Sequence, residues 1–439
     1  MSERPATVVA VVALMIVSGT LGFAGVGAVS ASSATQAADS YVVEQGDACQ
    51  PIEPISTSRT VESFYDYRNH ETHPDSEPEE RQYSSYGTAH LQEDDTSHLM
   101  LHEGTDGVSL VIVHDRLDSE TDGGVATFDI VGLPGESEWV VQDDLYDGES
   151  NMVEWYEDDN HFGASWIWAE GRTDGGAIRG GLNDEFSLTI HPAFNEDAEL
   201  YGAEDIYDPD YAGDGEITDW HVLSGSFEDP DRIELSSLDE PVTIRTGTCD
   251  DPTVTYDRTN GETVAHVTDA AADDPILLQP SMETDDGVRF EKIELTGLDG
   301  EASFGFESDR PDGLPDSPDD ADALGALTVT GDSTDYPATV TISVDADLLE
   351  ERDAAAEEIA LYEVNGTEWN ETETTIRNDA GDAHLFTAEV SSLDGFVVGH
   401  QEPEPDERSY TSPTPGFTAG AAVAAAFVLA LLWAVRRRG

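Results

Sequence analysis

The stretch VSLVIVHDRLDSETDGGVATFDIVGL, residues 108–133, decides how the first half of this chain folds. Its two apolar runs, VSLVIVHD (Val108–Asp115) and GVATFDIVGL (Gly124–Leu133), are rich in β-branched residues and have the length of strands. The Asp, Ser, Thr and Gly residues between them are typical of a turn. Similar runs lie at Glu138–Gln142, Ser165–Glu170, Glu185–His191 and Val242–Thr246. We therefore expect an all-β first domain with acidic loops over residues 41–250.

Five of the seven tryptophans fall within this first domain. They are Trp139, Trp155, Trp166, Trp168 and Trp220. Trp166 and Trp168 are two residues apart, so they share one face of the predicted strand. Packing in a hydrophobic core is the main interpretation, and a platform on which sugars stack is the alternative.

A second strand-rich domain is expected over residues 252–400. Asn260-Gly261 and Asn365-Gly366 lie between apolar runs, which is the strongest short signal for a β-hairpin. A short helix is expected around Asp347–Glu358. Residues 401–415 are acidic and contain prolines, so they are expected to form a linker.

Both ends of the chain are apolar. Residues 1–31 have the pattern of a secretory signal peptide, with an apolar run from Val8 to Val29 and a small-residue cleavage site after Ala31, and an uncleaved N-terminal anchor is the alternative. Residues 416–435 are uncharged and long enough to cross a membrane as a helix. A basic tail, residues 436–439, follows and is expected to stay in the cytoplasm. Its charged members are Arg436, Arg437 and Arg438. The chain between the two ends is then extracellular.

The C-terminal tail resembles the PGF-CTERM sorting signal of halophilic archaea. The resemblance rests on Pro415, Gly416 and Phe417, followed by the apolar segment and the basic end. It implies recognition by an archaeosortase, removal of the helix and attachment of a membrane lipid, as a GPI signal is replaced by its anchor. A plain C-terminal membrane anchor is the alternative.

The second domain resembles the PGF-pre-PGF domain that precedes such tails. The matching features are SVDADLL at residues 343–349, the hairpin LYEVNGTEW with Trp369, and the closing FVVG at Phe396–Gly399. This resemblance implies a β-sandwich. The expected fold class is therefore mainly β, with two sandwich-like ectodomains between an N-terminal signal helix and a C-terminal transmembrane helix.

The chain is extremely acidic, with 94 Asp and Glu residues, 19 Lys and Arg residues and a formal net charge of −75. Repulsion of this size opposes compaction in dilute salt, but at molar salt the Debye length falls to about 3 Å and screens it. The charge therefore fits a protein that works in brine. It excludes nucleic acid as a partner, because there is no basic stripe to neutralise phosphates.

The chain has two cysteines, Cys49 and Cys249, one near each edge of the first domain. Two cysteines are too few for a disulfide framework or a thiolate zinc site. Extracellular location permits a disulfide between them, which would connect the first and last strands of the domain.

Two N-glycosylation sequons begin at Asn365 and Asn370, in the expected hairpin.

A candidate cation-binding loop is the segment DPDYAGDGEITD, which loosely follows the spacing of a calcium loop. Its possible cation ligands are Asp208, Asp210, Asp214, Glu216 and Asp219, although a solvated acidic loop is the simpler interpretation. No other cofactor is indicated.

His98, His102 and His114 lie near predicted strands but lack the HExxH pattern of a zinc protease, so they are interpreted as ordinary strand residues. The sequence shows no GxSxG motif, P-loop or GxGxxG motif. We therefore expect a non-enzymatic, membrane-anchored surface glycoprotein, with envelope polysaccharide or S-layer protein as a possible partner. The alternative is a secreted, membrane-anchored hydrolase or carbohydrate-binding protein.

Overall fold

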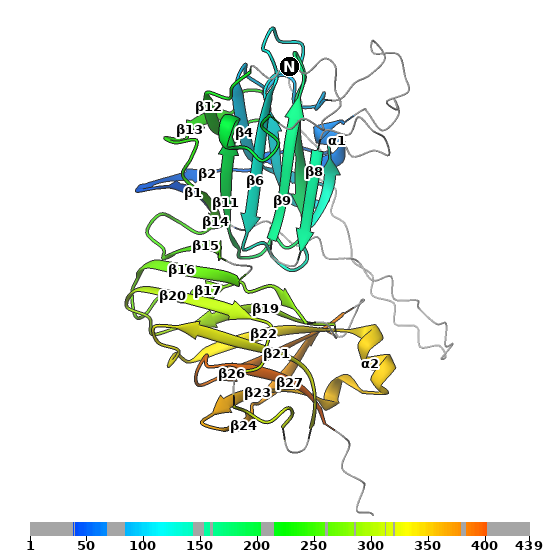
Figure 1. Cartoon of the computed structure of the whole chain (residues 1–439), viewed down its shortest axis with the longest axis vertical. Coiled ribbons are helices and arrows are strands. Elements are labelled where there is room, and N and C mark those ends of the chain that lie inside the picture. The colour runs from blue at the N-terminus through cyan, green and yellow to red at the C-terminus, as the bar shows by residue number, and fades with distance from the viewer. Residues whose placement is uncertain are drawn as a thin grey trace, which may run out of the picture. The chain divides into compact units, whose positions relative to one another are not determined.

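The structure is a computed structural model. It describes residues 38, 40–67, 84–143, 153–158, 161–202, 215–259, 262–284, 287–311, 313–318, 321–378 and 383–401. The chain divides into two compact units, Met1–Asp251 and Pro252–Gly439 (Figure 1). The predicted signal peptide, the transmembrane segment, the sorting triplet and the basic tail lie outside the described residues, as does the linker beyond Gln401.

The first unit contains two sheets of mostly antiparallel strands. The β6 sheet has the order β2 (Ala48–Ile52), β1 (Tyr41–Gln45), β14 (Val242–Thr246), β11 (Ser187–Phe194), β6 (Gly124–Val131), β9 (His161–Trp168) and β8 (Val153–Asp158). The β5 sheet has the order β13 (Asp231–Glu234), β12 (Asp219–Ser224), β4 (Thr96–Gly104), β5 (Gly107–His114), β10 (Asp174–Arg179) and β7 (Glu138–Gln142). The short strand β3 (Ile55–Ser56) also joins β4, and both β3 and β12 run parallel to it. The predicted all-β character of this region is confirmed.

The two sheets of the first unit enclose one hydrophobic core. Leu110 and Ile112 of β5 face Phe128 of β6 and Trp166 of β9 across this core. A 3₁₀ turn (Asn195–Asp197) follows β11 and leads to a small cluster on the other side of the β6 sheet. Four of the five tryptophans are buried, namely Trp139, Trp166, Trp168 and Trp220, and Trp155 packs against the core. The tryptophans are therefore core residues, and they do not form an exposed sugar platform.

The continuous apolar run in β5 is explained by burial on both of its faces. Val111 and Val113 point away from the main core into a second cluster, where helix α1 (Val61–Tyr65) covers the β5 sheet. Phe64 and Tyr65 fill this cluster from the helix, and Thr60 caps the helix by accepting a hydrogen bond from Ser63 N. A strand buried on both faces has no polar side to alternate with.

The second unit also has two sheets. The β21 sheet has the order β15 (Thr253–Thr259), β16 (Glu262–Ala270), β20 (Gly300–Glu307), β21 (Ala321–Gly331), β27 (Phe396–Gln401), β23 (Ile359–Asn365) and β24 (Glu368–Glu371). The β22 sheet has the order β17 (Ile276–Leu278), β19 (Val288–Leu295), β22 (Ala338–Asp345), β26 (Ala383–Val390) and β25 (Thr374–Asn378), with β18 (Met282–Glu283) paired to β19. Large buried aromatic residues come from both sheets, including Tyr256, Phe290, Phe304 and Phe386.

The expected helix of the second unit is shorter than predicted. Helix α2 (Ala346–Arg352) stops because Asp353 takes a left-handed conformation, with φ of 53°. A separate 3₁₀ turn (Ala356–Glu358) completes the segment. The hairpin at Asn365 is also shifted by one residue, because Asn365 pairs with Glu368 and leaves Gly366 and Thr367 as the loop. Gly366 supplies the positive φ, 67°, that this loop requires.

Within the described residues, no helix has the length and apolar character needed to cross a bilayer.

Most of the described Asp and Glu side chains lie at the surface. Among the described carboxylates the buried ones are Asp115, Asp143, Asp174 and Glu363. The rest are at least partly in contact with solvent.

Candidate functional site

A disulfide joins the beginning and the end of the first unit's sequence. Cys49 and Cys249 are bonded, with their Cα atoms 5.8 Å apart and 200 residues of sequence between them. This confirms the predicted pairing, but with one correction: Cys49 lies on the second strand, β2, and Cys249 lies just beyond the last strand, β14. Both strands flank β1, but Cys49 pairs with Glu44 whereas β14 ends beside Tyr41, so the loop after β14 turns back to bring Cys249 to Cys49.

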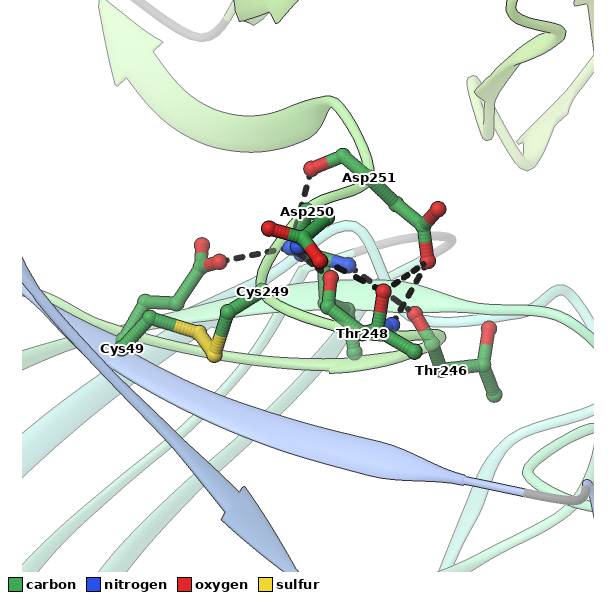
Figure 2. Close-up of a disulfide and its surroundings, with 8 residues drawn as sticks. Cys49, Thr246, Thr248, Cys249, Asp250 and Asp251 are labelled. Atoms are coloured by element: carbon green, nitrogen blue, oxygen red, sulfur yellow. Dashed lines mark hydrogen bonds and ion pairs between the residues drawn. A yellow bond between two sulfur atoms is a disulfide. The ribbon is translucent and has the colours of Figure 1, made fainter.

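A buried arginine organises the loop that presents Cys249. Arg245 is 3 % exposed, and its Nη2 donates to Glu44 Oε1 at 2.7 Å and to the carbonyl of Thr248 at 2.9 Å. Figure 2 shows Thr248 and Asp251 beside the disulfide, where the Asp251 carboxylate accepts from Thr248 N at 2.6 Å. The loop after β14 is therefore fixed by its own hydrogen bonds as well as by the disulfide.

The three histidines considered in the sequence occupy two different faces. His98 and His102 are four residues apart and share the face of β4 that points away from the main core. His102 stacks on Phe64 with ring centroids 4.1 Å apart, and burial lowers its pKa to about 4. His114 instead points into the main core, stacked on Trp168 at 5.2 Å, and burial lowers its pKa to about 3. These three residues therefore do not form one metal cluster.

His98 instead meets residues from other parts of the chain. Strand β12 runs parallel to β4, so His221 lies directly beside His98, with ring centroids 6.2 Å apart. Glu93, in the loop before β4, places Oε2 3.1 Å from His221 Nδ1 and 4.0 Å from His98 Nε2. One possible ligand atom from each residue lies within 4.8 Å of the other two. We call this group the His98–His221–Glu93 cluster.

The electrostatics of the cluster keep His98 neutral. Burial is the main cause that lowers the pKa of His98 to about 3. The positive charge of Arg232 acts in the same direction, against a smaller opposing effect of a hydrogen-bonding interaction with the Val113 backbone. A neutral imidazole is the form that binds metals.

Arg232 borders the cluster from strand β13. Its Nη1 donates to Glu93 Oε2 at 2.9 Å, and its Nη2 donates to the Leu91 carbonyl at 2.7 Å. The two hydrogen bonds fix the loop that carries Glu93 against the edge of the sheet. Because Glu93 is partly exposed, this side of the cluster is open to solvent.

The sequence could not reveal this cluster. His221 lies more than a hundred residues after His98, and no short motif connects them. No strand was predicted around Trp220 and His221, and the parallel pairing of β12 with β4 is a property of the fold. Local spacing grouped His98 with His102, which shares its strand face but lies outside the cluster.

The predicted cation loop is only partly described. Asp208, Asp210 and Asp214 lie outside the described residues. Glu216 and Asp219 are exposed, and Asp219 begins β12 and accepts a hydrogen bond from its neighbour Thr218. The described part of the loop therefore shows solvated carboxylates.

The two sequons are placed where a glycan could be attached. Asn365 ends β23 and Asn370 lies on β24, and both side chains are exposed on this hairpin. Attachment of a bulky, solvated glycan requires this kind of surface position.

A buried polar group lies beneath α1. Tyr65 donates to Asp143 Oδ2 at 2.6 Å, and both residues are fully buried. Burial raises the pKa of Tyr65 well above its usual value, and the charges of Asp143 and Asp174 raise it further. The hydrogen bond attaches the helix to the end of β7, which gives this group a structural role.

Comparison with known proteins identifies no relative of this chain. No protein-family model matches it, and neither does any curated protein or solved structure.

Proposed function

We propose that this chain is a non-enzymatic cell-surface glycoprotein of a halophilic archaeon, exported and anchored to the membrane through its C-terminal sorting signal. The observation that carries the proposal is the Cys49–Cys249 disulfide. Disulfides persist in oxidising compartments outside the cell and are rare inside it. The apolar segments at both ends of the sequence supply the route of export and the anchor.

The proposed topology places the two β units outside the cell, between the signal helix and the transmembrane helix. An archaeosortase acts on Pro415, Gly416 and Phe417, and the mature chain carries a membrane lipid. The exposed sequons at Asn365 and Asn370 support glycosylation of the second unit. The second unit is then a membrane-proximal stalk, and the first unit contacts envelope polysaccharide or an S-layer protein.

The surface composition supports the proposed environment. With few of its carboxylates buried, the described part of the chain presents an acidic surface that needs concentrated salt for screening. This surface also disfavours nucleic acid as a partner.

The proposal is tested on cells that express the chain. An antibody against the first unit should label intact cells, and deletion of the protein should weaken envelope integrity or adhesion. Labelling that appears only after lysis contradicts the proposal.

The second candidate is a membrane-anchored hydrolase, and the His98–His221–Glu93 cluster is the observation that favours it. Two histidines, one glutamate and an open position are a ligand set used by zinc hydrolases. Turnover of a substrate by the purified full chain, lost in Glu93→Gln, would support this alternative. Carbohydrate binding by stacking on tryptophan is less favoured, because the tryptophans of the first unit are in or packed against its core.

A further inference from the structure

The outer face of the β5 sheet brings two imidazoles and one carboxylate within reach of a single ion. Zinc bound tetrahedrally at about 2.0–2.2 Å separates its ligand atoms by about 3.4 Å. Glu93 Oε2 lies 3.1 Å from His221 Nδ1 and 4.0 Å from His98 Nε2. Small side-chain rotations would therefore bring these atoms to zinc-binding distances.

A second, independent observation is the state of His98. Its side chain is 1 % exposed, and neither ring nitrogen has a hydrogen-bond partner of normal geometry among the described residues, the interaction with the Val113 backbone being weaker than that. Leaving a buried donor unsatisfied is costly, and such groups require an explanation. Since Nε2 faces the Glu93 carboxylate, a bound cation would use the nitrogen that the protein leaves unused.

We propose that the first unit binds one Zn²⁺ ion through His98, His221 and Glu93. Imidazole nitrogens favour zinc over the hard cations Mg²⁺ and Ca²⁺, which prefer all-oxygen sites. The fourth position faces solvent beside Glu93 and is filled by water. This site goes beyond the proposed surface function and does not depend on it.

Arg232 is the residue that opposes a cation here, and the geometry accommodates it. Arg232 is hydrogen-bonded to Oε2 of Glu93, but a carboxylate has two oxygens and can accept from both sides. Because the two histidines approach the same oxygen, Oε2, binding of the ion through Oε2 requires Arg232 Nη1 to move its hydrogen bond to Oε1. The arginine then orients the ligand in the manner of an outer-shell partner.

The test is calorimetric titration of the full-length chain with ZnCl₂, in detergent and molar KCl. Excess Mg²⁺ occupies the many surface carboxylates, so that only a site with imidazole ligands is measured. The expected result is one Zn²⁺ per chain with a Kd of about 1 μM or tighter. Bound zinc should also raise the unfolding temperature of the first unit, because it binds only the folded state.

The variants Glu93→Gln and His221→Gln should each weaken zinc binding by about 100-fold or more. His161→Gln is the matched control, because His161 is paired with Asp129 in the same unit and lies outside the cluster. It should leave the affinity unchanged. His98→Gln is expected to remove binding too, but Glu93 and His221 are partly exposed and keep the test valid if that variant does not fold.

Absence of a stoichiometric zinc site above the Mg²⁺ background overturns the proposal. So does binding that survives unchanged in Glu93→Gln or His221→Gln. In either case the cluster is a network of hydrogen bonds that connects β12, β13 and the loop before β4.

Discussion

Breaking the Cys49–Cys249 disulfide should destabilise the first unit by an amount that the structure allows us to estimate. The bridge closes a loop in which the two cysteines are 200 residues apart, which includes nearly all of the strands of that unit. In the chain-entropy model a cross-link of this length lowers the entropy of the unfolded chain enough to contribute about 5 kcal/mol. The variant Cys49→Ser/Cys249→Ser should lose this amount from the free energy of unfolding.

The local packing makes the estimate easy to interpret. Cys249 is exposed and Cys49 only partly buried, so replacing them with serine removes little hydrophobic contact. The hydrogen bonds of β1 to β14 and β2, and those of Arg245 to the loop, remain in the variant. The loss should therefore arise mainly in the unfolded state.

The assay is denaturant unfolding in molar KCl, followed by tryptophan fluorescence. Trp139, Trp166, Trp168 and Trp220 are buried in the first unit and report its unfolding. The second unit has no cysteine, so its own transition, followed by circular dichroism, is an internal control. Wild-type protein treated with a reductant should match the double variant.

A loss below about 1 kcal/mol would refute the reasoning. It would mean that the unfolded first unit is already restricted by residual structure, so that the disulfide removes little further freedom. An equal loss in the transition of the second unit would also contradict it.

Two further predictions concern pH and salt. Burial holds the pKa of His114 near 3, below its ordinary value of 6.5, so the contribution of the neutral, buried imidazole to stability is fully present above pH 6.5 and is lost as the pH falls toward 3. Between pH 7 and pH 5 the free energy of unfolding should decrease by about 2 kcal/mol from this residue. The variant His114→Gln should show a correspondingly weaker pH dependence, and an unchanged dependence would contradict the assignment. Cooperative unfolding measured by circular dichroism should be lost below about 1 M KCl, where charge repulsion is less screened, and an unchanged transition in dilute buffer would contradict adaptation to brine.

Local sequence patterns predicted much of this fold. The expected strands Glu138–Gln142 and Val242–Thr246 coincide with β7 and β14, because β-branched and aromatic runs bounded by turn residues leave few other structures. The disulfide could be predicted because only one pairing exists. The buried tryptophans also follow from their position on apolar strands.

The parts that could not be predicted depend on long-range pairing. His221 reaches His98 only because β12 lies parallel to β4, and neither segment encodes that neighbour in its own residues. The early end of α2 depends on the left-handed conformation of Asp353, a residue that does not usually mark a helix end as glycine does. Long-range strand pairing and the end of the helix were therefore the features that local sequence patterns could not predict.

The most direct test of the proposed function is the intact mass of the mature protein, purified from cell envelopes. We expect a chain that lacks residues 1–31, ends near Pro415 and carries a lipid, with glycan mass on Asn365 or Asn370. Non-reducing peptide mapping of the same sample should link Cys49 to Cys249. A full-length chain of 439 residues that begins at Met1, ends in Arg438-Gly439 and has two free thiols would contradict the account.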